Sequence, residues 1–308
     1  MDLFFAIAAF VFGLLFGSFL NVCIYRLPRG RSVVSPGSAC PGCEKPIAFY
    51  DNVPVLSWLI LRGRCRRCKA RISPRYMIVE LLTAFLFLAC FQRFGLTLAT
   101  LKYCVFGFLL LGLIFTDAET KLLPDKLTLP GIVLGLIFSW FVPVNDLLAR
   151  LLPGLFSLPL NSSSSWHILS LADSLLGAIV GASFIYGAGA IYLKVRHVEG
   201  MGFGDVKLMG MIGAFLGLKL TVFTLFTASV AGSLFGIGTM LVVWVKRTRR
   251  RIERQHETAA VARRRAWQSA RMIYQHYEMP FGVFLGSMAI FAFFFGDHIL
   301  RWYWGQFS

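Results

Sequence analysis

Residues 98–117 read LATLKYCVFGFLLLGLIFTD, an apolar stretch that ends on a carboxylate. A helix needs about 20 mostly apolar residues to cross a bilayer, and Leu98–Phe115 approaches that length. Charged residues in or beside such a span are costly and are therefore candidates for function. This stretch predicts a membrane helix with Asp117 at its end.

Seven further apolar stretches predict membrane helices. They are Leu3–Val22, Met77–Cys90, Leu127–Val142, Leu171–Leu193, Val206–Leu218, Leu220–Val245 and Phe281–Ile299. Val206–Leu218 is short and Gly-rich, so a bent or re-entrant segment is the alternative there. No Lys or Arg precedes Leu3, whereas a signal peptide has a positive n-region, and we interpret the first stretch as a retained helix. The predicted fold class is an all-α polytopic membrane protein with about eight transmembrane helices.

The composition supports this class. Of the 308 residues, 57% are hydrophobic and 15% are charged, and the formal net charge is +16. Globular domains have roughly 45–50% apolar and about 25% charged residues. A soluble nucleic-acid-binding protein can carry such a charge, but not with so little polar surface. The length excludes a small disulfide scaffold, and the apolar content excludes a disordered tail.

The positive charge lies mainly in two loops. Residues 26–75 hold eleven Lys and Arg residues, and residues 246–271 hold ten. With eight spans, both segments fall on the same side of the membrane, together with five of the other ten Lys and Arg residues. Cytoplasmic loops carry the Lys and Arg excess of membrane proteins. We therefore expect both loops to face the cytoplasm and the N-terminus to lie outside.

Four of the seven cysteines form two pairs, Cys40-Pro-Gly-Cys43 and Cys65-Arg-Arg-Cys68. Two Cys-x-x-Cys pairs can hold one metal ion in a tetrahedral site, and this spacing is close to that of known zinc sites. Two disulfides and a redox pair are the alternatives, but cytoplasmic thiols stay reduced. No His or Glu supplies an open coordination position, so the predicted zinc is structural. The sequence thus predicts a small cytoplasmic zinc-binding domain between the first and second helices.

Four acidic residues lie in or beside predicted spans: Glu80, Asp117, Asp125 and Asp205. The topology places Asp117 and Asp205 at similar depth near the inner leaflet. Two adjacent carboxyl groups do not both ionise easily, so one can hold a proton while the other acts as a base toward water, as in aspartic proteases. The glycines before Asp205 let backbone approach an extended substrate. The alternatives are glycines that serve helix packing and an interfacial charge without a catalytic role.

A set of motifs runs in order along nearly the whole chain. The set is Gly13-Leu-Leu-Phe-Gly17-Ser-Phe-Leu-Asn21, Tyr25-Arg-Leu-Pro28, the two cysteine pairs, Asp51-Asn-Val-Pro54, Arg62-Gly-Arg64, Arg75-Tyr76, Leu123-Pro-Asp125, Gly202-Phe-Gly-Asp205-Val-Lys207 and Pro280-Phe-Gly282. In this set the chain resembles the bacterial type IV prepilin peptidases, also called leader peptidase/N-methyltransferases, of type IV pilus and type II secretion systems.

The resemblance implies an enzyme of the bacterial inner membrane that cuts the basic leader from prepilins at the cytoplasmic face. It also implies N-methylation of the new N-terminal residue with S-adenosylmethionine. The family's catalytic aspartates match Asp117 and Asp205. Further supporting or substrate-binding candidates are Asp125, Gly202, Gly204 and Lys207. The implied partners are prepilins, the bilayer and pilus or secretion assembly components, and we expect no nucleic acid.

The four cysteines match the family's zinc-binding cytoplasmic domain, which is associated with methyl transfer. The candidate residues for that reaction are Asn21, Arg26, Gly63, Arg64 and Arg75, and the sequence contains no Rossmann-type glycine fingerprint. The predicted domains are a first membrane helix over 1–25, a four-cysteine zinc domain over 26–76 and a membrane aspartic peptidase domain over 77–308. The last contains a basic cytoplasmic insertion at 246–278.

Three departures from the family pattern stand out. Met77 and Val283 occupy positions where the family often has proline, and we expect them to affect local backbone more than chemistry. The insertion at 246–278 is basic and helix-prone, which favours a position on the anionic inner leaflet or a docking surface for an assembly partner. The rival functions are a peptidase without methyltransferase activity, an ion-coupled transporter using Asp117 and Asp205, and a zinc-dependent membrane adaptor for nucleic acid.

Overall fold

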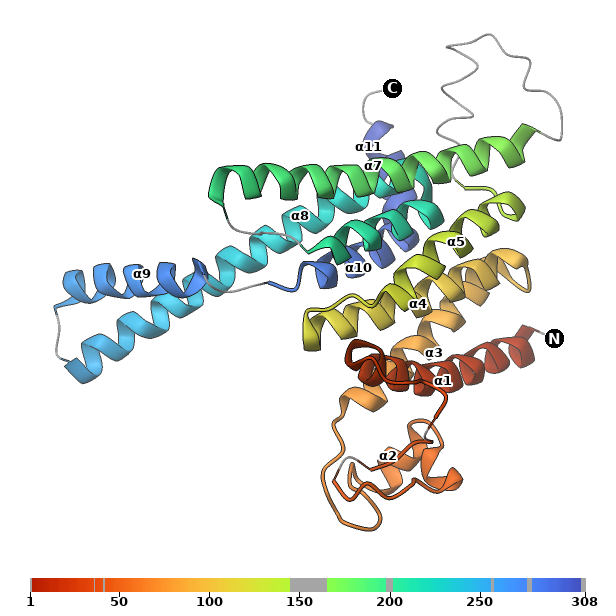
Figure 1. The fold of residues 1–308 in the computed structure, drawn as a ribbon, viewed down its shortest axis with the longest axis horizontal. Coiled ribbons are helices and arrows are strands. Elements are labelled where there is room, and N and C mark those ends of the chain that lie inside the picture. Colours follow the sequence, from red (N-terminus) through yellow and green to blue (C-terminus); the bar gives the residue numbers. More distant parts are fainter. Residues whose placement is uncertain are drawn as a thin grey trace, which may run out of the picture.

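The computed structural model describes residues 2–35, 37–40, 42–144, 165–197, 202–255, 258–275 and 279–305. Within these residues the regular elements are helices, with two isolated antiparallel β-bridges at Ala39–Pro46 and Arg64–Arg71. The larger helices are α1 (Asp2–Arg26), α3 (Arg75–Phe94), α4 (Leu98–Thr120), α5 (Asp125–Phe141), α7 (Ser165–Arg196), α8 (Phe203–Gln255), α9 (Ala259–Gln275) and α10 (Phe281–Phe291). Figure 1 shows most of them in one bundle, with a loop-rich subdomain around α2 (Leu56–Ile60) at its edge.

Each of the eight predicted stretches lies in a helix, but six helices of the described chain are long and apolar enough to cross a membrane. The eight predicted spans and the six observed candidate spans differ at two places in the chain. Helix α5 has 17 residues and is shorter than the other candidates. Helix α8 contains two predicted stretches, 206–218 and 220–245, in one assignment of 53 residues. The last span combines α10 with a π-helical turn (Ala292–Gly296) and α11 (Asp297–Trp304).

The two parts of α8 meet at Gly217. This residue has φ 75° and ψ 177°, a non-helical conformation that only glycine adopts readily. A straight helix would hold Met209 and Thr221 about 18 Å apart. Both residues nevertheless pack against Gly181 of α7. The chain therefore folds back at Gly217, and the two parts of α8 run in opposite directions in Figure 1. The short Gly-rich stretch is a separate helical segment rather than the start of one long rod.

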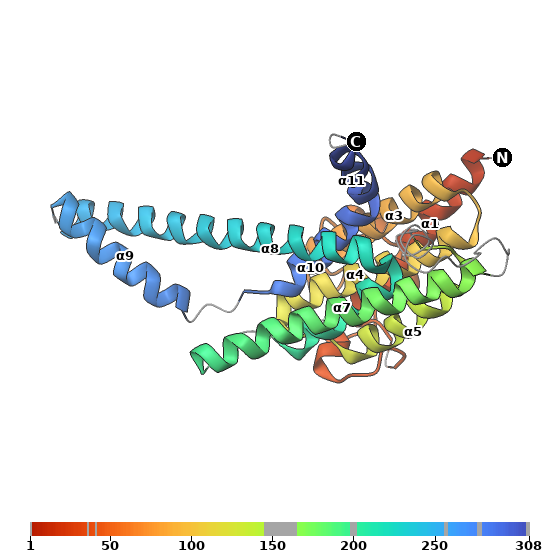
Figure 2. The ribbon, with the colours of Figure 1, turned by 90° about the horizontal axis from the view of Figure 1, so that it is seen from above.

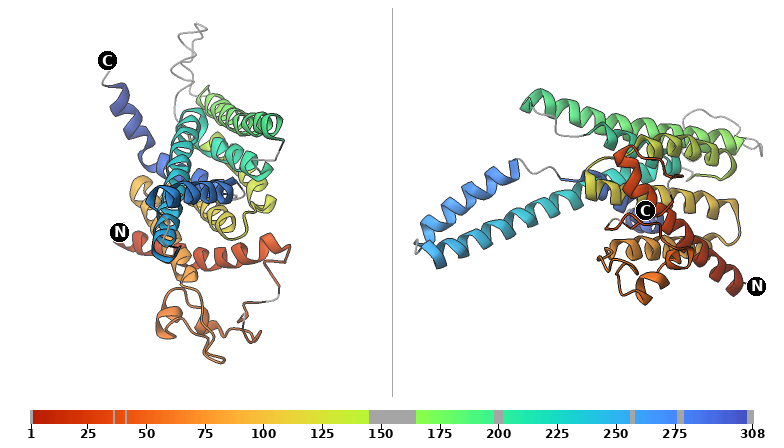
Figure 3. Two further views of the ribbon diagram at one scale, coloured as in Figure 1. Left: turned by 90° about the vertical axis from the view of Figure 1, so that its left-hand side faces the viewer. Right: turned by 60° about the horizontal axis from the view of Figure 1, so that its bottom comes forward.

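Helices α1 and α3 approach each other through glycine. A Cβ on Gly13 would lie 2.5 Å from the Cα of Ala84, and a Cβ on Gly17 would lie 2.7 Å from the Cα of Glu80. Small residues that bring backbones together in this way are typical of membrane helix pairs. The contact joins the two helices that flank the cysteine-rich subdomain, which Figure 3 shows beside the bundle.

The basic insertion folds as a helical hairpin of the end of α8 and α9, which extends beyond the bundle in Figures 1 and 2. Trp244 Nε1 donates a hydrogen bond to the Arg263 carbonyl at 3.1 Å, and the Trp244 ring contacts Trp267 edge to face at 5.9 Å. The buried face of α9 is a stripe of alanines, Ala262, Ala266 and Ala270. The packing therefore uses the apolar face of α9 inside the hairpin. Residues 256–257 and 276–278 of the predicted insertion lie outside the described residues.

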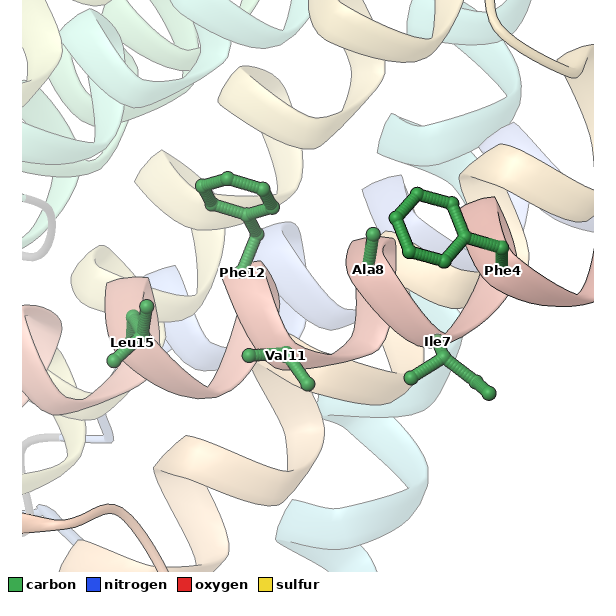
Figure 4. Close-up of a pocket in the computed structure, with 6 residues that line it drawn as sticks. All are labelled: Phe4, Ile7, Ala8, Val11, Phe12 and Leu15. Atoms are coloured by element: carbon green, nitrogen blue, oxygen red, sulfur yellow. The ribbon is translucent and has the colours of Figure 1, made fainter.

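The outer face of α1 carries a shallow groove of about 250 Å³ (Figure 4). Six apolar residues line it: Phe4, Ile7, Ala8, Val11, Phe12 and Leu15. Phe4 is 71% exposed and Phe12 is 58% exposed, as expected for side chains that face lipid. The lining of the groove does not include an acidic residue.

Candidate active site

Asp117 lies in the last turn of α4. The helix is capped by Lys121, which has a left-handed conformation and donates its backbone amide to the Asp117 carbonyl at 2.9 Å. Pro124 follows closely and immediately precedes α5. Because proline disfavours a helical conformation in the residue before it and cannot donate a backbone hydrogen bond, α4 does not continue through this position. The Asp117 residue is 4% exposed. A buried carboxyl group requires polar partners, and for Asp117 a hydrogen bond comes from the start of α10.

Asp205 lies in the first turn of α8 and is 8% exposed. Its backbone amide donates to the Gly202 carbonyl at 3.1 Å, and the Gly202 amide interacts favourably with its carboxyl group. The Asp205 and Asp117 side chains are close enough to repel each other electrostatically. The structure thus brings together the two carboxyl groups that the topology places at similar depth.

The N-terminus of α10 supplies the main polar contact of Asp117. The Val283 amide donates to Asp117 Oδ2 at 2.9 Å, and the Gly282 amide interacts favourably with the same carboxyl group. A Cβ on Gly282 would lie 2.9 Å from Asp117 Oδ2. The Val283 position thus bears on local backbone, as expected, and it places an amide that a proline would lack against a candidate catalytic group. Pro280 signals a helix start in the sequence, but not which carboxyl group that start faces.

Leu123 connects the elements around the two carboxyl groups. A Cβ on Gly204 would lie 2.9 Å from the Cβ of Leu123, and a Cβ on Gly282 would lie 3.2 Å from Leu123 Cδ1. Leu123 thus packs between the starts of α8 and α10. Two helix N-termini and the C-terminal turn of α4 meet here. Helix N-termini favour negative charge, so the arrangement is suited to carboxylates.

Asp125 and Lys207 form an ion pair of 2.7 Å between the first turns of α5 and α8. Lys207 Nζ also lies over the Phe203 ring, 5.1 Å from its centroid. Both side chains are partly exposed, and such pairs contribute about 0–1 kcal/mol. The structure therefore brings together two of the predicted supporting residues, with Asp125 engaged by Lys207.

The four paired cysteines form the metal-binding cluster that their spacing predicts. The Sγ atoms of Cys40, Cys43, Cys65 and Cys68 all lie within 4.8 Å of one another. The Cys40 and Cys68 sulfurs are 3.7 Å apart. Tetrahedral zinc with bonds of about 2.3 Å separates its sulfur ligands by about 3.8 Å. The donor set and its dimensions fit one zinc ion.

The two cysteine pairs share one backbone geometry. Glu44 and Lys69, which follow the second cysteine of each pair, have positive φ angles of 55° and 59°. Each donates its amide to the carbonyl of the first cysteine of its pair, at 2.8 and 3.0 Å. The cluster is thus built from two equivalent tight turns that direct two thiols each toward one point.

Two contacts tie this subdomain together and to the membrane helices. Arg66 binds both oxygens of Asp51, with a shortest distance of 2.7 Å, and this hydrogen bonding holds the Asp51 pKa below its usual range. The Val55 amide donates to Glu80 Oε2 of α3 at 2.7 Å. Glu80, one of the four acids beside predicted spans, therefore anchors the subdomain rather than joining the pair of aspartates.

Two of the methyl-transfer candidates lie at the junction of α1 and α3. Asn21 Nδ2 donates to the Tyr76 carbonyl at 2.9 Å. Arg75 forms an ion pair with Glu119 of α4, and its guanidinium carbon lies 4.7 Å from the centroid of the Tyr76 ring. The two residues therefore meet around Tyr76.

The other three candidates have separate surroundings. Arg26 donates to two carbonyls of the loop that follows α1, at 3.1 and 3.0 Å. Gly63 has φ 63°, and a Cβ there would lie 2.8 Å from the ring of Trp58. Arg64 is exposed. The contacts of the described residues do not join the five candidates into one site.

These features define a polytopic membrane protein with a buried pair of aspartates at the meeting point of three helix ends and a separate cluster of four cysteines. Residues 11–94 match the model of the bacterial peptidase A24 N-terminal domain, and residues 104–237 match that of the type IV leader peptidase family. The chain belongs to the type IV leader peptidase family.

Curated relatives extend the match to nearly the full chain. A protein of Aeromonas hydrophila is 34% identical, over 96% of this chain and 92% of its own length. Proteins of Myxococcus xanthus and Neisseria gonorrhoeae are 39% and 37% identical, over 77% and 73% of this chain and 64% and 78% of their own lengths. All three are named prepilin leader peptidase/N-methyltransferase. No solved structure matches the chain.

Proposed function

We propose that this protein removes leader peptides from prepilins and N-methylates the new N-terminus, the two activities in the names of its relatives. The pair of buried carboxyl groups, Asp117 and Asp205, carries the peptidase half of the proposal. Two interacting carboxyl groups do not both ionise easily. One then acts as a base toward water, while the other donates a proton to the scissile carbonyl oxygen.

The glycines before Asp205 have different roles in this proposal. A Cβ on Gly204 would press against Leu123, so this glycine serves the packing of the α8 start. A Cβ on Gly202 would meet no neighbour closer than 3.9 Å among the described residues. Gly202 therefore leaves its backbone accessible to an extended substrate, whereas Gly204 holds Asp205 in place. Asp125 and Lys207 support the site by linking α5 to α8.

The cysteine cluster is proposed to hold one structural Zn²⁺ through Cys40, Cys43, Cys65 and Cys68. Four thiolates leave no open position for substrate, so the metal stabilises the subdomain over 26–76. S-adenosylmethionine is the proposed methyl donor. Asn21 and Arg75 remain the best-placed candidates for that reaction, because they lie where the subdomain joins the membrane helices.

We propose that the zinc subdomain, both aspartates and the α8–α9 hairpin lie on the cytoplasmic side of the bacterial inner membrane, with the N-terminus outside. The distribution of Lys and Arg supports this orientation. Prepilins insert an apolar helix behind a basic leader, so their cleavage site would lie at this membrane boundary. The hairpin is available to pilus or secretion assembly components.

The test is prepilin processing by detergent-purified protein with a labelled methyl donor, scored by product mass. Asp117→Asn and Asp205→Asn should each reduce cleavage by at least about 100-fold, a typical contribution of a catalytic acid or base. Glu253→Gln, at an exposed carboxylate of the α8–α9 hairpin, is the control and should retain full activity. Processing by both aspartate variants would contradict the dyad. Cleavage without label on the product would instead establish a peptidase without methyltransferase activity.

A further inference from the structure

The backbone around the two aspartates distinguishes them. Asp117 accepts a 2.9 Å hydrogen bond from the Val283 amide, in the first turn of another helix, and the Gly282 amide also faces this carboxyl group. Asp205 has only a weaker interaction with the Gly202 amide of its own turn. Backbone donors favour the ionised form of a carboxyl group. When the two carboxyl groups share one negative charge, backbone hydrogen bonding stabilises that charge more on Asp117 than on Asp205.

The donors to Asp117 are held by packing. Gly282 is buried and lies against both Asp117 and Leu123. The Val283 amide also faces the Pro280 carbonyl at 3.3 Å, but its shorter contact is the 2.9 Å bond to Asp117. Donors that are fixed before the reaction stabilise charge without reorganisation. The start of α10 is thus a preorganised cradle for a carboxylate at Asp117.

The other charges near this carboxyl group do not reverse that preference. Asp205 of α8 repels Asp117 electrostatically when both carboxyl groups are ionised. This repulsion is removed when Asp205 holds the proton. Lys121, just beyond α4, also acts on Asp117 and favours its ionised form. The contribution of α10 is the Val283 amide, supported by the neighbouring amide of Gly282.

We propose that Asp117 is the ionised base of the resting enzyme, that Asp205 is the protonated acid, and that the Val283 amide is a positioning group that maintains this order. This inference rests on the proposed peptidase function. Water attacks the scissile carbonyl carbon, its proton passes to Asp117, and the Asp205 proton passes to the carbonyl oxygen. On collapse, Asp117 protonates the leaving amine as the C–N bond breaks, and the diol hydroxyl returns a proton to Asp205.

Val283→Pro tests the donor directly. Proline has no amide hydrogen and is tolerated in the first turn of a helix. Val283→Ala is the matched control, since it shortens the side chain and keeps the amide. The measurement is the rate of prepilin cleavage by full-length protein across pH, scored by product mass, with thermal unfolding as a check on folding.

We expect the acidic limb of the Val283→Pro profile to move up by about one pH unit, which is a loss of about tenfold in rate at a fixed pH on that limb. The rate at the optimum should change much less, and Val283→Ala should follow the wild type. Replacement of Val283 by its α-hydroxy acid, which turns the amide into an ester, should give the same shift if the proline variant is unstable.

Superimposable profiles for the wild type and both donor-deleted forms would overturn the assignment of Asp117 as the base. That outcome differs from failure of the proposed function. In the latter case the wild type does not cleave prepilin, or Asp117→Asn still does.

Discussion

Asp117 and Gly282 meet so closely that Gly282 has no room for a side chain, because a Cβ there would lie 2.9 Å from Asp117 Oδ2. Gly282→Ala should therefore displace the carboxylate and lower the rate of prepilin cleavage at least about tenfold, since small misplacements of catalytic groups are costly. Cleavage assays on purified protein give the measurement.

The control for that variant is Gly238→Ala in α8, where a Cβ would meet nothing within 4 Å. This variant should keep both its activity and its melting temperature. If Gly282→Ala cleaves as fast as Gly238→Ala, the close contact is not important for the position of Asp117.

The ion pair between Asp125 and Lys207 should make a small contribution. Asp125→Asn, Lys207→Gln and the double variant form a cycle whose coupling energy should be below about 1 kcal/mol, because both side chains are partly exposed. Thermal unfolding measures it, and all three variants should still cleave prepilin. Loss of cleavage in Asp125→Asn comparable with that of Asp117→Asn would show that Asp125 has a catalytic role.

The purified protein should contain one zinc ion per chain. Cys68→Ser should lower the zinc content and loosen the subdomain, because one of the four ligands is lost. We expect methylation to fall more than cleavage, since the aspartate pair lies among the membrane helices. Cys104→Ala, at a buried cysteine of α4, is the control and should keep its zinc. Full zinc content in Cys68→Ser would contradict the proposed four-cysteine site.

The turn at Gly217 should be intolerant of other residues. Its φ of 75° with ψ of 177° costs an L-residue about 1–3 kcal/mol, and a Cβ would also press on the Asp173 carboxyl group. Gly217→Ala should therefore lower the melting temperature, whereas Gly238→Ala should not. Equal melting temperatures for the two variants would argue against the fold-back within α8.

The Asp51–Arg66 pair should make stability depend on pH in acid. Arg66 lowers the Asp51 pKa in the folded protein, so the pair stabilises the fold above the ordinary aspartate pKa of about 3.9. That stability is lost as the pH falls through the lowered pKa. The melting temperature of the wild type should exceed that of Asp51→Asn at about pH 5–7, and the difference should shrink as the pH falls below about 4. A constant difference across this range would contradict the pairing.

The sequence predicts the membrane helices, the cysteine cluster and the family well, because each depends on a local pattern. Apolar length reports a span, and two Cys-x-x-Cys pairs report a tetrahedral site. The proximity of Asp117 and Asp205 follows from counting spans, since both lie at the same end of the bundle. These features need no knowledge of which helix packs against which.

The remaining features depend on packing between distant segments. The contact between Val283 and Asp117 arises because α10 begins beside the end of α4, and nothing in either segment specifies that neighbour. The chain folds back at Gly217, but the sequence contains 29 glycines and does not show which of them reverses the chain. Likewise, the basic and helix-prone character of the insertion does not specify that the alanine face of α9 packs inside the hairpin.

The close approach of α1 and α3 has a consequence for how the protein assembles. The cysteine-rich subdomain is the loop that joins these two helices, and a long flexible loop costs entropy when its ends are brought together. Metal binding between residues 40 and 68 would replace much of that loop with a fixed structure. Zinc would then favour helix association in the membrane without touching either helix, and metal supply would affect the yield of correctly paired α1 and α3.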